Sequence, residues 1–265
     1  MDALDVYVDG IGFWTPGVPD WPSLQRVLEG GEAVAANANA KPSPNRLPPT
    51  ERRRAPEPVL LASEAAGQAC AMAGSDVSAL ACVFTSTHGD LAITDAMCAT
   101  LAADPRELSP TRFHNSVHNA PAGYWTVATQ CHAGATAISA AHASFAAGLL
   151  EAAIEVEADG EPVLLSAYDI AARGPLAEVA PSTLPFATAV VLSPTRGAAS
   201  LARLSLTMTP EPAAPIELPS PLAGLTGNPM AVQSLPLLIA LAQAQPAAVA
   251  LRAGAGTWLK IVVTP

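Results

Sequence analysis

Short apolar runs recur through the first 195 residues of the chain, and each is bounded by polar or turn-forming residues. Runs of this length that carry almost no charge are typical of strands buried on both faces of a sheet. We therefore predict strands at Val6–Ile11, Ala79–Thr85, Tyr124–Cys131, Pro162–Ala167 and Ala187–Leu192.

Longer segments rich in small or apolar residues lie between these runs, and they have the length of helices. The alternation of strand and helix predicts an α/β fold with a mostly parallel sheet covered on both faces. Two polar segments, 33–58 and 109–123, predict loops, the second a loop or a short helix. The predicted helices are Pro22–Glu29, Val59–Ala73, Ala92–Ala103 and Ala133–Leu150.

The pattern changes from Pro194 onwards, where the regular alternation stops and proline becomes frequent. Here we predict a strand at Leu201–Met208 and a proline-rich connector at Pro210–Pro229. The remainder predicts a helix at Ser234–Gln243 and a final strand pair at Val249–Ala253 and Trp258–Val263.

Cys131 ends one predicted strand, and the predicted helix Ala133–Leu150 follows at once. A side chain on such a turn lies at the positive end of the helix dipole, which favours a thiolate. The sequence therefore predicts a nucleophile turn at Cys131. The alternative is an inert thiol at a buried helix start, and both interpretations stay open at this point.

A base for this thiol is hard to find, because no histidine occurs after His142. A nucleophilic cysteine needs an imidazole or a similar group within hydrogen-bonding distance. His114 and His118 are four residues apart and could share a metal on a helix, but no third ligand is evident. We expect no metal, and we expect these histidines to order a polar loop. The missing base indicates a degenerate relative of an enzyme.

Several segments, in the right order, resemble the β-ketoacyl synthases. "DVYVDGIGFWTPGV" is similar to the opening strand and turn of that family, and "LSPTRFHNSVHNAPAGYWTVATQC" resembles its approach to the active-site turn. "EPVLLSAYD" resembles the next core strand and ends in Asp169, near an acidic residue common there. "LRAGAGTWLKIVV" resembles a worn form of the last turn and strand.

The resemblance implies a thiolase-like, layered α-β-α fold of condensing enzymes. Residues 1–195 would form a complete N-terminal half, and residues 196–265 a truncated remnant of the second half, packed on the same domain. Cys131 falls on the family's nucleophile position. The two histidines that the family takes from its second half are missing here, so no catalytic residue is expected and Cys131 is interpreted as a relic.

Non-catalytic relatives of ketosynthases are chain-length factors, and this sequence resembles a short form associated with aryl polyene clusters. The resemblance implies a heterodimer with an active ketosynthase, whose acyl or polyene tunnel this chain would shape. Ordinary core packing is the alternative for the stripe on the helix Ala92–Ala103. The expected partner-facing or tunnel-facing residues are Thr94, Met97, Cys98, Leu101, Phe113, His114, His118, Asn119 and Trp125.

No cofactor is expected in this chain. The growing acyl chain would be held on the phosphopantetheine of an acyl carrier protein, which would serve this chain only indirectly. Two rival functions remain: a compact acyltransferase or thioesterase that pairs Cys131 with His88, His114 or His118, and a homodimeric scaffold without a ketosynthase partner.

The net charge and the low content of charged residues limit the kinds of partner that this chain can bind. The net charge is −10 and only 14% of residues are charged, while 50% are hydrophobic. Such a surface disfavours nucleic acid and suggests a large subunit interface, although genome composition would also explain it. Arg52-Arg53-Arg54 is either a solvated loop or a docking point for an acidic partner.

The expected compartment is the cytoplasm. The four cysteines show no metal-ligand spacing, and the acidic start of the chain predicts no signal peptide. The apolar runs are too short or too polar to span a bilayer.

Overall fold

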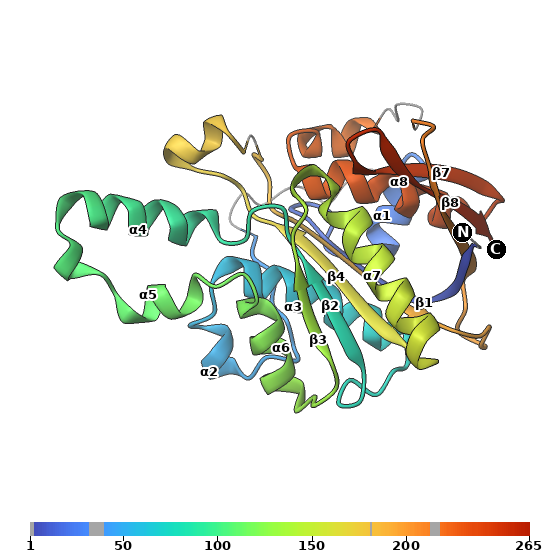
Figure 1. Ribbon diagram of the computed structural model, residues 1–265, viewed down its shortest axis with the longest axis horizontal. Coiled ribbons are helices and arrows are strands. Elements are labelled where there is room, and N and C mark those ends of the chain that lie inside the picture. Colours follow the sequence, from blue (N-terminus) through green and yellow to red (C-terminus); the bar gives the residue numbers. More distant parts are fainter. Residues whose placement is uncertain (1–2, 32–39, 181, 213–217) are drawn as a thin grey trace.

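The computed structural model describes residues 3–31, 40–180, 182–212 and 218–265, and they form one eight-stranded sheet with helices on both faces (Figure 1). The strand order is β3-β2-β4-β5-β1-β6-β8-β7. The strands are β1 Leu4–Trp14, β2 Ala81–Thr85, β3 Ala135–Ile138, β4 Val163–Asp169, β5 Phe186–Ser193, β6 Ala202–Thr209, β7 Ala247–Gly254 and β8 Thr257–Thr264.

The sheet is mixed, so the prediction of a mostly parallel sheet is wrong. Only β2 pairs in parallel, with β3 on one side and β4 on the other, and the remaining neighbours in the sheet are antiparallel. A parallel neighbour needs a crossover, usually a helix. Between β4 and β5, the described residues 170–180 and 182–185 contain the short 3₁₀ helix η3 (Gly174–Glu178) and no longer helix, and β5 returns antiparallel beside β4.

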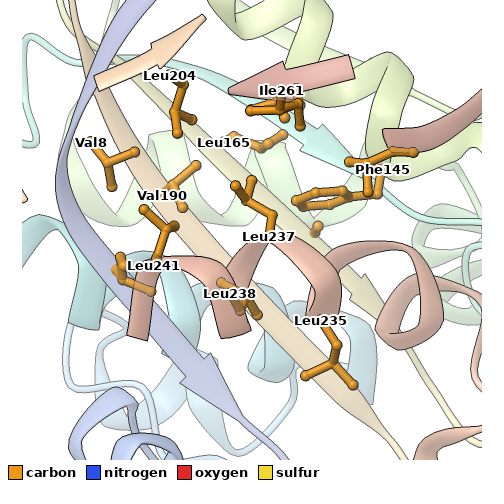
Figure 2. Packing of buried hydrophobic residues seen from close by; sticks show 14 of the residues in the cluster. Val8, Phe145, Leu165, Val190, Leu204, Leu235, Leu237, Leu238, Leu241 and Ile261 are labelled. Carbon is orange, nitrogen blue, oxygen red and sulfur yellow. The ribbon is translucent and has the colours of Figure 1, made fainter. Parts of the chain in front are cut away.

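Helices cover both faces of the sheet, which confirms the layered α-β-α architecture. On β4, Leu164 and Tyr168 belong to the core beneath α3 and α6, whereas Val163 and Leu165 belong to the core beneath α7 and α8. Figure 2 shows the α7/α8 side, where leucines of α8 meet strand residues. The covering helices are α1 Trp21–Leu28, α3 Glu57–Ala73, α6 Ala120–Thr129, α7 Ser144–Asp159 and α8 Pro229–Gln243.

Small residues let α3 lie unusually close to β1. A Cβ atom added to Gly12 would overlap the carbonyl oxygen of Ala65, and one added to Gly10 would overlap that of Ala69. The alanine-rich sequence of α3 therefore serves close packing against the sheet, in keeping with the low aromatic content of the chain.

An arm extends from the body of the molecule (Figure 1). It consists of α4 (Leu91–Ala103), the 3₁₀ helix η1 (Pro105–Glu107) and α5 (Pro110–Asn115). Asp90 caps α4 by accepting a hydrogen bond from the Ile93 amide at 2.9 Å. Within the described chain none of the α4 residues is buried, although Asp95 is the only charged residue of that helix. Exposed apolar surface of this kind is typical of interaction sites.

The region around Cys131 differs most from the prediction. Residues 124–131 are not a strand, because α6 occupies Ala120–Thr129 and ends at Gln130, which has a left-handed φ of 55°. Residues 133–150 are not one helix either: they contain β3, the 3₁₀ helix η2 (Ala141–Ala143) and the start of α7. Runs of small apolar residues fit a buried helix and a buried strand equally well, so length and composition misled the prediction.

The other predicted elements are found with shifted ends. The predicted loop 33–58 contains the short helix α2 (Pro49–Arg52), while its residues 33–39 lie outside the described residues. The connector Pro210–Pro229 contains the 3₁₀ helix η4 (Ser220–Leu225), and its residues 213–217 are likewise outside the described part. The final strand pair is confirmed as the β7–β8 hairpin.

Candidate functional site

A strained strand-to-helix turn joins β3 to α7. Ala141 has a positive φ of 49°, a conformation that residues other than glycine rarely adopt and that is enriched at functional sites. The turn exposes Ala140, Ala141 and His142, whereas Ala143 is buried, and it is flanked by Ser139. The geometry that the sequence assigned to Cys131 thus occurs ten residues later, and its tip carries methyl groups and an exposed imidazole.

The two serines that flank this turn are used to hold its backbone. The Ser144 hydroxyl donates to the Ala141 carbonyl at 2.7 Å and accepts from the Ala140 amide at 2.9 Å. The Ser139 hydroxyl donates to the Thr87 carbonyl at 3.1 Å. Both hydroxyls therefore stabilise the turn in its strained form.

Cys131 does not lie on a nucleophile turn. It follows the C-terminal end of α6, so it lies at the negative end of a helix dipole and not at the start of a helix. Its buried thiol donates to the Leu80 carbonyl at 3.3 Å. No imidazole of the described residues forms a hydrogen bond with this sulfur. Cys70 and Cys82 are also buried, and burial raises the pKa of each thiol to about 12.

A buried polar network lies where β2 and β4 end. Asp169 accepts hydrogen bonds from the Ser86 hydroxyl and from the Thr87 amide, both at 2.8 Å. Burial raises the pKa of this carboxyl above its usual value, against the effect of these hydrogen bonds. Asn228 caps α8 and donates to the Ser182 hydroxyl at 3.0 Å. The network holds the loop from which the arm begins, and no local pattern in the sequence pointed to Ser86 or Asn228.

The stripe predicted on α4 is exposed. Thr94, Cys98 and Leu101 lie along one helix face, and Leu101 is 46% exposed; Met97 is half-buried. Packing against the described residues therefore does not explain the stripe, because they bury none of its side chains. Phe113, on α5, is 64% exposed.

The polar residues and Trp125 separate into two environments. His114 and Asn119 are exposed and border a groove, whereas the half-buried His118 places its Nε2 atom 3.3 Å from the Ser86 carbonyl oxygen. Trp125 is fully buried among α3 and sheet residues. Its predicted place on the partner-facing or tunnel-facing surface is wrong, because it lies on the inner face of α6.

An open groove of about 620 Å³ runs between α2, the end of the arm and α6. Its volume is in the range of ligand and peptide sites, and Val127 beside it is 79% exposed. The groove is lined by Pro48, Glu51, His114, Val117, Asn119, Ala120, Gly123, Tyr124, Val127, Ala128 and Gln130.

The edge of the sheet nearest the arm is also open. β3 is the edge strand of the described sheet, and its sequence Ala-Thr-Ala-Ile contains neither a charge nor a proline to block further pairing. Figure 1 shows α6 between the arm and β3; α6 contacts β3, α5 contacts α4, and residues of α5 and α6 line the groove. We call this combined region the arm face.

Two possible kinds of site are not found in the described part of the chain. No group of three or more His, Cys, Asp and Glu side chains there could hold a metal ion. No described helix is long and apolar enough to cross a membrane.

The family model for the β-ketoacyl synthase N-terminal domain matches residues 25–259. The chain therefore belongs to the β-ketoacyl synthase family, which confirms the resemblance seen in its sequence. A search of curated proteins finds no significant match.

Solved structures of low sequence identity share the thiolase-like fold. A ketosynthase in complex with its chain length factor from Xenorhabdus doucetiae matches with a TM-score of 0.71 and 22% identity, over 98% of this chain and 99% of that chain. The ishigamide ketosynthase/chain length factor matches with a TM-score of 0.71 and 13% identity, over 98% and 99%. A type II acyl-carrier protein in complex with its ketosynthase matches with a TM-score of 0.71 and 13% identity, over 100% of this chain and 99% of that chain.

Proposed function

We propose that this protein is a non-catalytic chain-length factor, which pairs with an active ketosynthase in aryl polyene or related polyketide synthesis. The strand-to-helix turn carries the proposal. Its strained backbone is that of a reactive-residue turn, yet the turn carries Ala140, Ala141, His142 and Ala143 and so offers no thiol or hydroxyl nucleophile. A family member built in this way would bind the ketosynthase and form part of its tunnel wall, and it would not take part in covalent catalysis.

The arm face supports a subunit partner. It combines an apolar helix with no buried residue in the described chain, an unprotected edge strand and an open groove. Exposed apolar surface of this kind marks interfaces in stable proteins. A ketosynthase would cover α4 and α6 and could pair with β3, as in strand addition.

The growing chain would remain on the phosphopantetheine of an acyl carrier protein, so this subunit would need no cofactor of its own. Met97, Phe113 and Val127 are candidate stops for the tunnel at the subunit boundary. Each buried methylene of an acyl chain is worth about 0.8 kcal/mol, so moving a stop by one two-carbon unit would change product length.

The remaining parts of the proposal concern the organisation and location of the chain. We propose that residues 196–265 stand for a shortened second half of the family fold; β6, β7 and β8 extend the same sheet as β1. We also propose a cytoplasmic location, supported by four cysteines that are all free.

Co-expression with a cognate ketosynthase tests the function. We expect one complex on size exclusion, and condensation activity that is lost when the ketosynthase cysteine is replaced by alanine. Cys131→Ala in this chain should leave that activity unchanged, because its thiol is buried and hydrogen-bonded to Leu80.

Two results would contradict the proposal. One is turnover of an acyl thioester by this chain alone that Cys131→Ala abolishes, which would indicate an acyltransferase or thioesterase. The other is a homodimer that does not bind the ketosynthase, which would indicate a scaffold.

A further inference from the structure

A small cavity lies at the base of the arm, between the two ends of the arm and strand β4. About 10 Å³ of it is accessible to water, which is enough for one water molecule and too little for an organic ligand. Prolines and other apolar residues of α3 and α6 form part of its wall. The polar part of the wall consists of Asp90, Asn115, His118 and Tyr168.

The hydroxyl of Tyr168 is the group in this wall that most needs a partner. Tyr168 belongs to β4 and is only 1% exposed, and its hydroxyl has no hydrogen-bond partner among the described residues. Most buried polar groups bond to protein or to ordered water, because burial without a hydrogen bond is costly. Burial, with the carboxyls of Asp169 and Asp90 nearby, raises the pKa of Tyr168, so the hydroxyl keeps its proton and can donate.

The other polar groups of the wall can complete the hydrogen bonds of a water molecule. Asp90 caps α4 with one carboxylate oxygen and can accept a further bond on the other. The Nε2 atom of His118 lies 3.3 Å from the Ser86 carbonyl oxygen, and donation there leaves Nδ1 as an acceptor in the neutral ring. Asn115 accepts from the Tyr124 hydroxyl at 3.3 Å, and its amide nitrogen remains a donor. Buried waters usually make about three such bonds.

A metal ion is the other occupant that would be small enough. Divalent cations need several carboxylate, imidazole or thiolate ligands around one point. Within the described part of the chain, no group of three or more His, Cys, Asp and Glu side chains could hold such an ion. The mixture of donors and acceptors in the wall therefore favours water.

We propose that one buried water molecule binds in this cavity and joins the Tyr168 hydroxyl to the polar groups at the two ends of the arm. Asp90 immediately precedes the first helix of the arm, Asn115 ends the last one, and Tyr168 lies in an inner strand of the sheet. The water therefore fixes the base of the arm to the core. This inference does not depend on the proposed function.

Tyr168→Phe in the full chain tests the proposal, because it removes the hydroxyl and keeps the ring. Losing the bond to the water should lower the melting temperature by about 2–4 °C. Amide hydrogens of α4 and α5 should exchange about fivefold faster, since the base of the arm opens more readily. Without a bound water, the substitution would instead remove an unsatisfied hydroxyl, and the melting temperature would rise or stay the same. That result, or unchanged exchange in the arm, overturns the proposal.

Ser63→Ala is the matched control. The Ser63 hydroxyl is also buried without a partner among the described residues, but Ser63 does not line the cavity. Its removal should not lower the melting temperature, and it should leave exchange in the arm unchanged. A fall equal to that of Tyr168→Phe would mean that loss of any buried hydroxyl has this effect, which also overturns the proposal.

A crystal structure of the full chain, at a resolution that shows ordered water, gives a direct measurement. We expect one peak at about 2.6–3.2 Å from the Tyr168 hydroxyl and at the same distance from a polar group at an end of the arm. The peak should be missing in Tyr168→Phe. No peak in the wild type overturns the proposal. So does a peak with contacts of about 2.0–2.4 Å, which would indicate a metal ion.

Discussion

At the residue scale, the buried carboxyl of Asp169 shows how one side chain stabilises the local structure behind the arm. Its Oδ1 atom accepts hydrogen bonds from Ser86 and Thr87, whereas Oδ2 is buried without a partner among the described residues. Burial without a second partner disfavours the charged carboxylate and favours the neutral carboxylic acid. The stability of the loop that precedes α4 is therefore expected to depend on pH.

We expect Asp169→Asn to change the pH dependence of stability. Burial raises the folded-state pKa of Asp169 above the unfolded value, so its contribution is fully present below the unfolded pKa and is lost as pH rises through the folded pKa. Relative to the variant, the wild type should lose free energy of unfolding above about pH 4, by at most about 1.4 kcal/mol per pH unit. Urea denaturation at pH 4.5 and pH 8 measures this.

Asp76→Asn is the control for that experiment. Hydrogen bonds from Ser78 lower the pKa of Asp76, which is exposed, so the effect of its replacement should have the opposite sign. Parallel pH profiles for wild type and Asp169→Asn would show that the buried carboxyl does not titrate differently on folding.

At the scale of elements, the contact between α3 and β1 sets the spacing of one layer of the fold. The strand contributes Gly10 and Gly12 where the helix backbone approaches, and the helix contributes alanines. In an interior packed this densely, an added side-chain atom finds no free space, and the backbone has to move to accommodate it. The layer that carries α6, and with it the groove, therefore depends on two positions in β1.

Gly12→Ala should lower the free energy of unfolding by about 1–3 kcal/mol or more, because its Cβ atom would overlap the Ala65 backbone and separate α3 from β1. Gly123→Ala is the control. A Cβ atom at Gly123 meets nothing within 4 Å, and alanine in a helix is favoured over glycine by about 1 kcal/mol, so stability should rise slightly. Chemical denaturation compares the two; equal stability of Gly12→Ala and wild type would refute the packing argument.

At the scale of the whole molecule, the described fold exposes backbone and apolar side chains at one end, where β3 and the arm lie. The sheet continues to β3 without a cover for its edge, and the arm extends without a buried residue in α4. Helices as short as α5 are marginal in isolation and depend on packing. The stability of the arm is thus expected to depend on assembly.

Val127→Asp should weaken binding to the ketosynthase at least tenfold, because it places a carboxylate on the most exposed large apolar side chain of the groove. The melting temperature of the isolated chain should stay unchanged. Val232→Asp alters a 46% exposed valine on α8, away from the arm face, and should bind like the wild type. Equal affinities for both variants, measured by titration calorimetry, would remove α6 from the interface.

The sequence alone determined the family, the layered α/β architecture and the lack of histidine after His142. These follow from local patterns, since the length and polarity of a run predict a buried element whatever its neighbours are. The sequence also indicated an apolar stripe on α4, and only the structure showed that the stripe has no cover within the described chain.

Tertiary structure decided which turn has the reactive geometry. Cys131 and Ala141 lie in similar runs of small residues, which suit helix and strand alike. Pairing of Cys82 with Ala135, 53 positions apart in the chain, makes residues 135–138 a strand and so places the turn at Ala141. The same long-range packing buries Trp125 and makes most of the sheet antiparallel. Partners so distant in sequence leave no local signal, and for that reason the location of the turn emerged only from the fold.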